Sequence, residues 1–410
     1  MLQINRRQLL AGGAALLAPL PQARAQAPAP IRIGVLADFS GPYRDTSGPT
    51  ALACAKQAVE DLDLSARGIP VEVLQGDHQN KPDLALALAR QWIDQSGVDM
   101  ICEVNNSAIA LAVAGLVQEK NKVQVNTGAL SAALTGERCS ANTVHWTADT
   151  WMLANTVGKA TVRNGGDSWF LIVADYAFGH QMERDLTRFV ESSGGKVAGS
   201  VRFPFPGTTD FASYLVQAQA SRAKVVGLLM AGADMVNCIK QAREFGVTQR
   251  GVRLAGTPMF VTDIHALGLE TAQGLLLSEA FYWDLNDRTR AFLERVKPKV
   301  AGNWPNQEHA GTYSGVLHYL KAVAEMGLPA AKASGLEVLT RMKAMPTDDD
   351  CFGAGTLRAD GRKVHPSYLF QVKAPGESRG PWDYYRLEGT VPAEEAFRPI
   401  SEGGCPLVKT

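Results

Sequence analysis

The sequence predicts an α/β protein built from two doubly wound lobes, because strand and helix patterns alternate along it in two separate series. Strands that are joined through helices by short loops form parallel sheets with right-handed crossovers. The chain is also too long for one ordinary core, and its length fits two lobes. The expected strands span 31–37, 71–75, 99–102 and 123–126 in the first series, and 169–174 and 224–230 in the second.

The first expected strand shows the pattern that the others repeat. Apolar residues alternate from Ile31 to Val35, which is typical of a strand. The strand ends in the polar loop Asp38 to Tyr43, where Ser40-Gly41-Pro42 leaves backbone N–H groups free to bind a ligand. Apolar residues at helical spacing follow from Leu52 to Leu62. The order is therefore strand, binding-type loop and helix.

Residues 1–25 are predicted to be an export signal. The pair Arg6-Arg7 precedes an apolar run over 9–20, and Ala23-Arg24-Ala25 is a small-x-small cleavage site. The pair resembles a twin-arginine signal, although Asn5 stands where such signals carry Ser or Thr. The alternative, a membrane anchor, is disfavoured because a span needs about 20 apolar residues. The expected location is the periplasm.

The overall charge excludes some classes of partner. The chain has 41 basic and 41 acidic residues, and removal of 1–25 leaves 38 basic residues, a net charge of −3. A nearly neutral surface argues against nucleic acid or an anionic membrane as a partner.

The six cysteines suggest disulfides in an exported protein, and none shows the spacing of a metal site. Six cysteines allow fifteen full pairings, and this choice stays open. Cys139 and Cys405 lie in polar or glycine-rich segments, whereas Cys54, Cys102 and Cys238 lie in apolar periodic segments. Those three fit small buried hydrophobic residues at least as well as they fit bridges.

Polar loops that follow the expected strands form the candidate ligand site. In open α/β sheets, ligands gather at the carboxyl ends of the strands. Ser107 and Ser131 lie near helix N-termini, where an anion is favoured. For any single loop, helix capping is the more frequent role of such residues, so the coincidence across loops carries the prediction. The loops are 38–43, 105–107, 127–131, 175–179, 231–234 and 257–260.

No catalytic residue, metal or cofactor is predicted. The chain has no His-Glu-x-x-His, Gly-x-Ser-x-Gly or Walker motif. Its seven histidines are scattered singly, as structural histidines usually are. Asp348-Asp349-Asp350 lacks the ligand spacing of a calcium loop and fits a solvated turn.

Several motifs, taken in their order along the chain, carry a family resemblance. They are Ser40-Gly41-Pro42, Asp175–Gly179, Phe205–Tyr214, Ala231–Asn237, Phe281–Asp284, His309–Tyr313 and Pro381–Tyr385. In this order the chain resembles the periplasmic solute-binding proteins of branched-chain amino-acid-type ABC importers.

The resemblance implies a type I periplasmic binding fold, in which two Rossmann-like lobes are joined by a three-crossing hinge and close on one ligand. The expected crossings lie near Thr147, Tyr282 and Met345. Lobe 1 would comprise 31–147 plus 283–345, and lobe 2 would comprise 148–282 plus 346–410. The implied protein is a monomer that delivers its solute to ABC permease subunits.

The resemblance also assigns binding roles. Asn106 and Ser107, with Thr127, Gly128, Ala129 and Ser131, would hold the ligand's carboxylate. Tyr176 would cover the ligand from the second lobe, and Asp149 would help to hold an ammonium group. The family's second acid has no counterpart in the loop 257–260, and losing a partner for a buried ammonium costs several kcal/mol. The expected ligand is therefore a small organic acid, aromatic or derived from an amino acid, rather than a standard aliphatic amino acid.

Aromatic residues flank the expected cleft and suit a flat or apolar ligand body. For Phe281 and Trp151 core packing is the more frequent role, and for Tyr176 ligand contact is favoured. Glu279 could supply the missing negative charge or be a surface acid, and the two readings weigh equally. The candidate ligand-binding residues are Ser40, Tyr43, Asn106, Ser107, Thr127, Gly128, Ala129, Ser131, Asp149, Tyr176, Gly232, Asp234, Thr257, Phe260 and Glu279.

A second class of function stays open, because the same fold serves as the ligand-sensing half of receptors. The chain could be a soluble subunit that presents a bound solute to a signalling receptor. Neighbouring genes for a permease and an ATPase would favour import, and a neighbouring sensor kinase would favour signalling.

Overall fold

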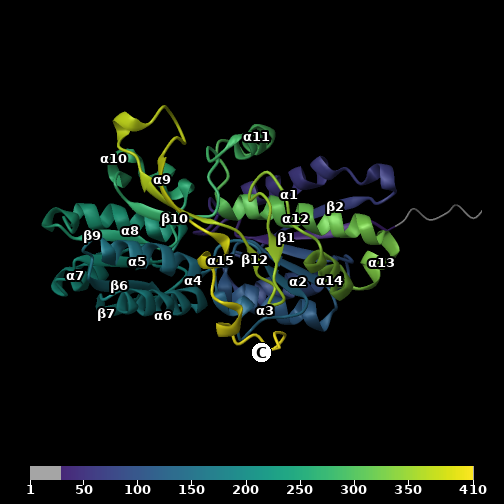
Figure 1. Ribbon diagram of the computed structural model, residues 1–410, viewed down its shortest axis with the longest axis horizontal. Helices are drawn as coiled ribbons and strands as arrows, with labels where there is room; N and C mark the ends of the chain where they lie inside the picture. The colour runs from purple at the N-terminus through teal and green to yellow at the C-terminus, as the bar shows by residue number, and fades with distance from the viewer. Residues whose placement is uncertain (1–28, 410) are drawn as a thin grey trace, which may run out of the picture.

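The computed structural model describes residues 29–409, and Figure 1 shows two α/β lobes side by side along the long axis. The predicted export signal, 1–25, lies outside the described residues. The prediction of two doubly wound parallel lobes is confirmed by two separate parallel sheets of five and four strands.

The first lobe is built on a five-stranded parallel sheet. Its spatial order is β2 (Val71–Asp77), β1 (Ile31–Ala37), β3 (Met100–Glu103), β4 (Val123–Asn126) and β5 (Thr143–His145). The chain reverses direction across the sheet at β1, so the loops after β1 and β3 diverge and leave a crevice between them. The predicted strands of the first series all form.

Helices cover both faces of this sheet because side chains along β1 alternate between them. Ile33 and Val35 pack with α1 (Gly48–Leu62), α12 (Gln307–Met326) and α14 (Gly335–Ala344). Leu36, on the opposite face, packs with α2 (Pro82–Asp94) and α3 (Ser107–Glu119). Helix α12 therefore joins the first lobe, although it lies far along the chain.

The second lobe has a four-stranded parallel sheet in the order β7 (Lys196–Phe203), β6 (Ser168–Ala174), β8 (Val225–Leu229) and β9 (Arg253–Gly256). Leu171 and Val173 face α4 (Thr150–Leu153) and α6 (Ala177–Ser192). Phe170 and Ile172 face α7 (Ala212–Ala220), α8 (Gly232–Glu244) and α9 (Val261–Leu267). The crossover here lies at β6, so the loops after β6 and β8 diverge.

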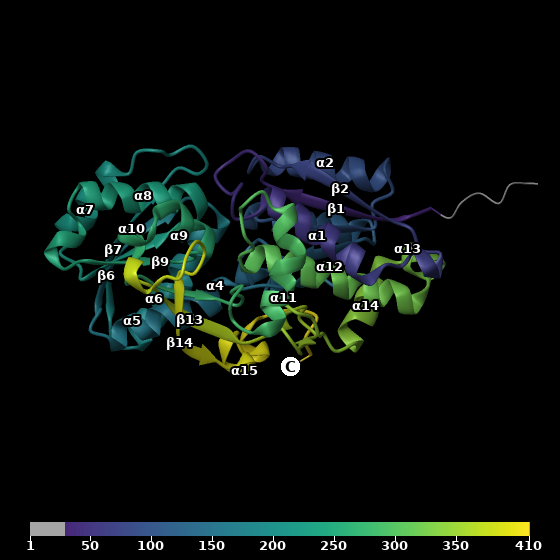
Figure 2. The same ribbon diagram turned by 90° about the horizontal axis from the view of Figure 1, so that it is seen from above.

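A third, antiparallel sheet extends the second lobe. It contains β10 (Leu276–Glu279), β13 (Ser367–Val372) and β14 (Tyr385–Val391). Figure 2 shows β13 and β14 in yellow below the second lobe. The remaining elements are α5 (Lys159–Arg163), α10 (Leu269–Ala272), α11 (Asp287–Val296), α13 (Leu328–Ala333), β11 (Thr356–Leu357), β12 (Lys363–Val364), α15 (Ala393–Ala396) and a π-helical turn over Ala154–Gly158.

The chain crosses between the lobes after β5, after β10 and after β12. The segment before β13 contacts the first lobe: Arg362 bridges to His145 on β5, and the Ser314 hydroxyl on α12 donates to Asp349 at 2.6 Å. We therefore propose a third crossing near Pro366 instead of near Met345. The chain passes between the lobes at these three places, and together they form the hinge.

Covalent and membrane features complete the fold. None of the fifteen full pairings forms: the described residues contain one disulfide, Cys139 with Cys405, and Cys54, Cys102, Cys238 and Cys351 are buried and free. Within residues 29–409, no helix is long and apolar enough to cross a bilayer.

Candidate ligand-binding site

A cavity lies between the lobes, where the carboxyl ends of both parallel sheets face each other. Loops after β1, β3 and β4 line it from the first lobe, and loops after β6, β8 and β9 line it from the second. The space left in it is about 10 Å³, close to that of a single water molecule, so the lobes must separate to admit a solute. The lining residues are Tyr43, Thr46, Asn105, Ser107, Gly128, Leu130, Tyr176, Phe178, Ala231, Phe260 and Glu308.

One end of the cavity lies at the N-terminus of α3. Asn106 caps this helix, and its side-chain oxygen accepts from the N–H groups of Ala108 at 3.0 Å and Ile109 at 3.2 Å. Ser107, the first residue of the helix, lines the cavity. The aligned peptide dipoles of α3 favour an anionic group here.

Asn105 adds a further donor whose orientation is fixed by its neighbour. The Asn80 N–H donates to Nδ1 of His78 at 3.0 Å, so the ring proton of this neutral histidine is on Nε2. That Nε2–H donates to Oδ1 of Asn105 at 2.9 Å. The other amide atom, Nδ2, is buried and has no partner among the described residues. A buried donor without an acceptor costs free energy, so a ligand oxygen at this end would satisfy it.

Away from α3, one acid lines the cavity and a second acid lies behind the lining. Glu308, in the first turn of α12, lines the cavity, and its pKa is raised well above the ordinary range by burial and by Glu103, Asp263 and Glu279. Glu103 lies directly behind Gly128, and burial raises its pKa to about 8. No lysine or arginine is among the residues that line the cavity. A positive group next to Glu308 would favour the ionised form of this acid.

Gly128 is required by this arrangement. A Cβ at this position would lie 2.0 Å from Oε2 of Glu103 and 2.7 Å from Cα of Asn105. The loop after β4 can pack against the loop after β3 only because no side chain intervenes. Leu130 contributes an apolar surface to the cavity, at the position where the family that the sequence resembles has Thr.

Aromatic rings from both lobes close the cavity. Tyr43 and Tyr176 line it, and their hydroxyls form a hydrogen bond of 2.7 Å. The ring of Phe205 stacks on both, with ring centroids 5.2 Å from Tyr43 and 4.5 Å from Tyr176. We call Tyr43, Tyr176 and Phe205 the aromatic gate. Phe205 belongs to the sequence motif Phe205–Tyr214, but no local pattern predicts its contact with Tyr43 and Tyr176.

The lobes also touch through their backbones beside the gate. The Ala233 N–H, in the first turn of α8, donates to the Pro42 carbonyl at 2.9 Å. Gly232, with φ of +58°, allows this approach, because a Cβ there would lie 2.4 Å from the same carbonyl oxygen. The structure is thus the closed form of the two lobes.

The cavity brings together five of the candidate residues proposed from the sequence: Tyr43, Ser107, Gly128, Tyr176 and Phe260. Other candidates lie close behind it with other partners. Asn106 caps α3, and Ser131 caps the 3₁₀ turn Ala132–Thr135. The Thr127 hydroxyl pairs with that of Thr312 at 2.8 Å, and the Ser40 hydroxyl donates to Asp77 at 2.6 Å. Ala129, Gly232, Asp234 and Thr257 do not line the cavity.

Two acids proposed as ammonium partners are engaged elsewhere. Asp149 caps α4 and pairs with the buried Arg362 at 3.2 Å. Glu279 accepts from the Tyr385 hydroxyl at 2.8 Å and from the Val261 N–H at 2.9 Å. Both side chains are buried, so the reading of Glu279 as a surface acid is wrong. Of the described residues, Glu308 is the acid that lines the cavity, and neither composition nor spacing marked it.

The described residues contain no group of three or more His, Cys, Asp or Glu side chains that could hold a metal ion. The arrangement can therefore be described as a donor end, an acidic side and an aromatic enclosure.

Comparison with known proteins gives a family. A sequence family described as periplasmic binding protein matches residues 30–379. The chain is 42% identical to a periplasmic binding protein from Burkholderia mallei, with a TM-score of 0.89 and coverage of 93% of this chain and 100% of that chain. A branched chain amino acid ABC transporter periplasmic ligand-binding protein from Burkholderia xenovorans LB400 is 38% identical, with a TM-score of 0.80 and coverage of 92% and 99%.

More distant structures share the fold. A solute-binding protein of an ABC transporter from R. palustris, solved in complex with benzoate, is 19% identical, with a TM-score of 0.80 and coverage of 92% and 99%. A search of curated proteins gives no match. The family match, the two close structures and the two-lobed architecture agree with the resemblance found in the sequence. The chain therefore belongs to the periplasmic binding protein family, the non-enzymatic solute-binding proteins of ABC transporters.

Proposed function

We propose that this protein captures a small zwitterionic, amino-acid-like solute in the interlobe cavity and delivers it to the permease of an ABC importer. The observation that carries the proposal is that the lining of one cavity contains both a donor without a partner, Nδ2 of Asn105, and an acid without an ion-pair partner, Glu308. The ligand's carboxylate would lie at Asn105, Ser107 and the N-terminus of α3. Its ammonium group would lie at Glu308.

This proposal narrows the expectation of a small organic acid or amino-acid-like ligand to the amino-acid-like class. That expectation rested on a missing acid, and Glu308 supplies one from α12. The benzoate-bound protein from R. palustris supports the alternative of an aromatic carboxylate, and the rings of Tyr43, Tyr176, Phe178 and Phe260 suit a flat ligand. These rings equally suit an apolar amino-acid side chain, and aromatic faces attract cationic groups. The related protein from Burkholderia xenovorans LB400, described as a branched chain amino acid transporter component, supports the amino-acid class.

The test is a thermal-shift screen followed by calorimetric titration. The panel contains amino acids with apolar or aromatic side chains, and benzoate and 4-hydroxybenzoate as acids without an ammonium group. A ligand that binds only the folded state raises the melting temperature. We expect amino acids to raise it and the benzoates to leave it unchanged. Tight binding of a benzoate without any amino acid binding would contradict the proposal.

Glu308→Gln sharpens this test. A hydrogen bond to a charged group contributes about 1.5–3 kcal/mol, so we expect the affinity for an amino acid to fall by roughly 10-fold to 150-fold. Glu294→Gln, an exposed position on α11, is the matched control and should bind like the unaltered protein. An unchanged affinity in Glu308→Gln would remove the assigned role of this acid.

We also propose export through the twin-arginine route, on the basis of Arg6-Arg7. Replacement of both arginines by lysine should leave the precursor in the cytoplasm, as measured by cell fractionation. Normal export of this variant would favour the general secretory route.

A further inference from the structure

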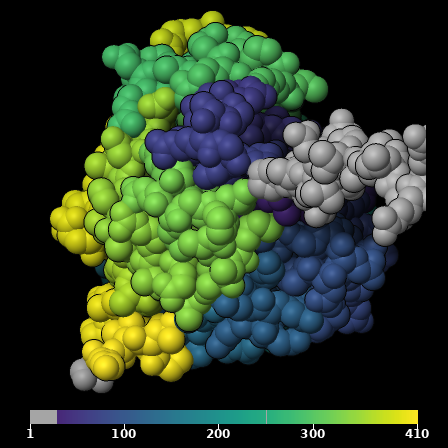
Figure 3. Space-filling view, turned by 90° about the vertical axis from the view of Figure 1, so that its right-hand side faces the viewer, coloured from purple at the N-terminus to yellow at the C-terminus, as the bar shows by residue number. Residues whose placement is uncertain are grey.

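The C-terminal segment returns to the first lobe after leaving the second. Strand β14 belongs to the sheet of the second lobe, yet Cys405 forms a disulfide with Cys139, which lies 266 residues earlier in the first lobe. Figure 3 shows the yellow C-terminal residues at the lower edge, against the blue part of the chain. We call residues 392–405 the strap. The chain thus connects the lobes a fourth time, outside the three hinge crossings.

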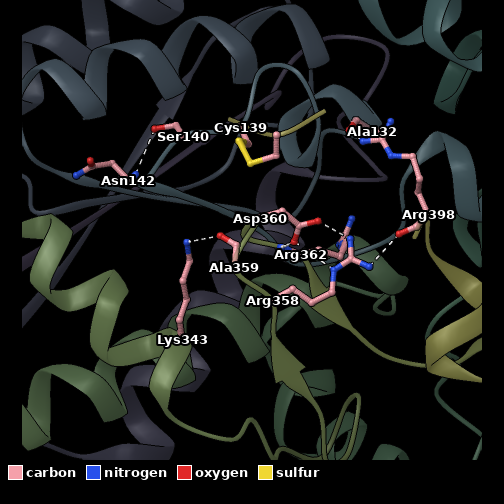
Figure 4. Close-up of a disulfide and its surroundings, with 11 residues drawn as sticks. Ala132, Cys139, Ser140, Asn142, Lys343, Arg358, Ala359, Asp360, Arg362 and Arg398 are labelled. Carbon is pink, nitrogen blue, oxygen red and sulfur yellow. Dashed lines mark hydrogen bonds and ion pairs between the residues drawn. A yellow bond between two sulfur atoms is a disulfide. The ribbon is translucent and has the colours of Figure 1, made fainter. Parts of the chain in front are cut away.

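The strap is fitted closely to the first lobe. Arg398 donates to the Ala132 carbonyl at 2.9 Å, and its own carbonyl accepts from Arg358 at 2.9 Å (Figure 4). A Cβ at Gly136 would lie 2.4 Å from Nη2 of Arg398 and 2.8 Å from the Gly403 carbonyl oxygen. The Cys139–Cys405 disulfide joins the strap to the first lobe close to Gly136, so this end of the strap is held both by packing and by a covalent bond.

The strap is also attached to the second lobe. Asn155, in the π-helical turn that follows α4, donates to the Glu395 carbonyl at 3.1 Å. Arg188 on α6 pairs with Glu402 at 3.0 Å. Trp151 on α4 lies under the guanidinium groups of both Arg188, at 4.5 Å, and Arg398. One aromatic ring therefore contacts a residue of the second lobe and a residue of the strap.

The middle of the strap lies against the third crossing. Phe397 is buried, and its ring packs under the Arg362 guanidinium at 4.4 Å and edge-on to His365 with centroids 5.0 Å apart. Arg362 in turn pairs with Asp149 and donates to the Thr147 carbonyl, which lies at the first crossing. The strap therefore contacts the third crossing directly and reaches the first crossing through Arg362.

We propose that the strap is a restraint on hinge opening that the Cys139–Cys405 disulfide keeps in place. Fully extended, its fourteen residues would span roughly 45 Å, so its length alone does not limit the lobes. The restraint comes from α15, Phe397 and Arg398, which hold the chain compact between two lobes. Closing the chain with a disulfide lowers the entropy lost when these contacts form. A narrower range of open states makes closure on a ligand less unfavourable.

The test compares the protein with Cys139→Ser/Cys405→Ser, using small-angle X-ray scattering without ligand. We expect a larger radius of gyration in the variant, and an unchanged radius would overturn the proposal. Reduction of the unaltered protein by a phosphine gives a second measurement, which decides the matter if the variant does not fold. Because no ligand is present, this result does not depend on the proposed function.

Ligand affinity gives a further readout, and this readout rests on the proposed function. With a ligand identified by the thermal-shift screen, we expect the affinity of the double variant to be about 5-fold weaker or more, the lower range of coupling between distant sites. If the unaltered protein bound no amino acid, the proposed function would be wrong, but the scattering result would still be valid. An equal affinity in both proteins would overturn the strap's effect on binding.

Discussion

The hydroxyl groups of Tyr43 and Tyr176 lie 2.7 Å apart, although the two residues belong to different lobes. Burial raises the pKa of both phenols, so both are neutral, and one donates to the other. Phe205 stacks on both rings. The aromatic gate is therefore a direct contact between the lobes beside the cavity, and we expect it to break when the lobes move apart.

Tyr43→Phe and Tyr176→Phe each remove this hydrogen bond and keep the ring. A neutral hydrogen bond contributes about 1 kcal/mol, so we expect the ligand to dissociate about 5-fold faster. Dissociation is measured by stopped-flow fluorescence. Tyr214→Phe is the control, because the Tyr214 ring packs against Phe203 and Phe211, away from the cavity. Equal dissociation rates in all three variants would show that the gate does not retain the ligand.

Gly232→Ala should weaken binding by blocking closure. The added methyl group would lie 2.4 Å from the Pro42 carbonyl oxygen, which belongs to the opposite lobe. Gly194→Ala is a matched control, because Gly194 also has positive φ, +89°, but a Cβ there meets nothing within 4 Å. Both variants should lose about 1 kcal/mol of stability in urea from the left-handed backbone. Calorimetry should show weaker binding in Gly232→Ala alone, and equal affinities would contradict the closure model.

Asp149→Asn should destabilise the fold. Its carboxylate pairs with Arg362, and both side chains are buried. Breaking such a pair leaves an uncompensated buried charge and costs about 3–5 kcal/mol. Urea unfolding measures the loss, and Asp175→Asn, at a half-exposed carboxylate, is the control that should change little. Full stability with lost ligand binding would instead restore Asp149 to its originally proposed ammonium role.

The stability of the ligand-free protein should fall as the pH rises from 6.5 to 8.5. Burial raises the pKa of Glu103 and Glu279 to about 8 and that of Asp263 to about 7. Since these acids titrate near pH 4 when unfolded, the folded state binds more protons over this range, and a rise in pH favours unfolding. Buried His309, with a pKa lowered to about 3, acts in the opposite sense only below about pH 6.5.

The measurement is the melting temperature in buffers of matched ionic strength. Glu103→Gln should reduce the slope with pH, because one raised acid is removed. A melting temperature that does not fall between pH 6.5 and 8.5 would contradict the raised pKa values of these acids.

Much of the site followed from the sequence because parallel strands carry their carboxyl-terminal loops to one edge of a sheet. That rule placed Tyr43, Ser107, Gly128, Tyr176 and Phe260 together without knowledge of any contact, and all five line the cavity. The same local patterns predicted β1 to β4 in the first lobe and β6 and β8 in the second, since the alternation and spacing of apolar residues are properties of neighbouring residues. They did not predict β5, β7 or β9.

The tertiary structure alone decided which residues that are distant in the chain come into contact. Glu308 enters the cavity because α12 packs on α1, and nothing next to Glu308 in the chain signals that position. The partner of Asp149 is Arg362, 213 residues away, and the partner of Cys139 is Cys405. Local pattern fixes which element forms and which side of it is buried, whereas the packing of whole elements selects among many equally plausible partners for a charge or a thiol.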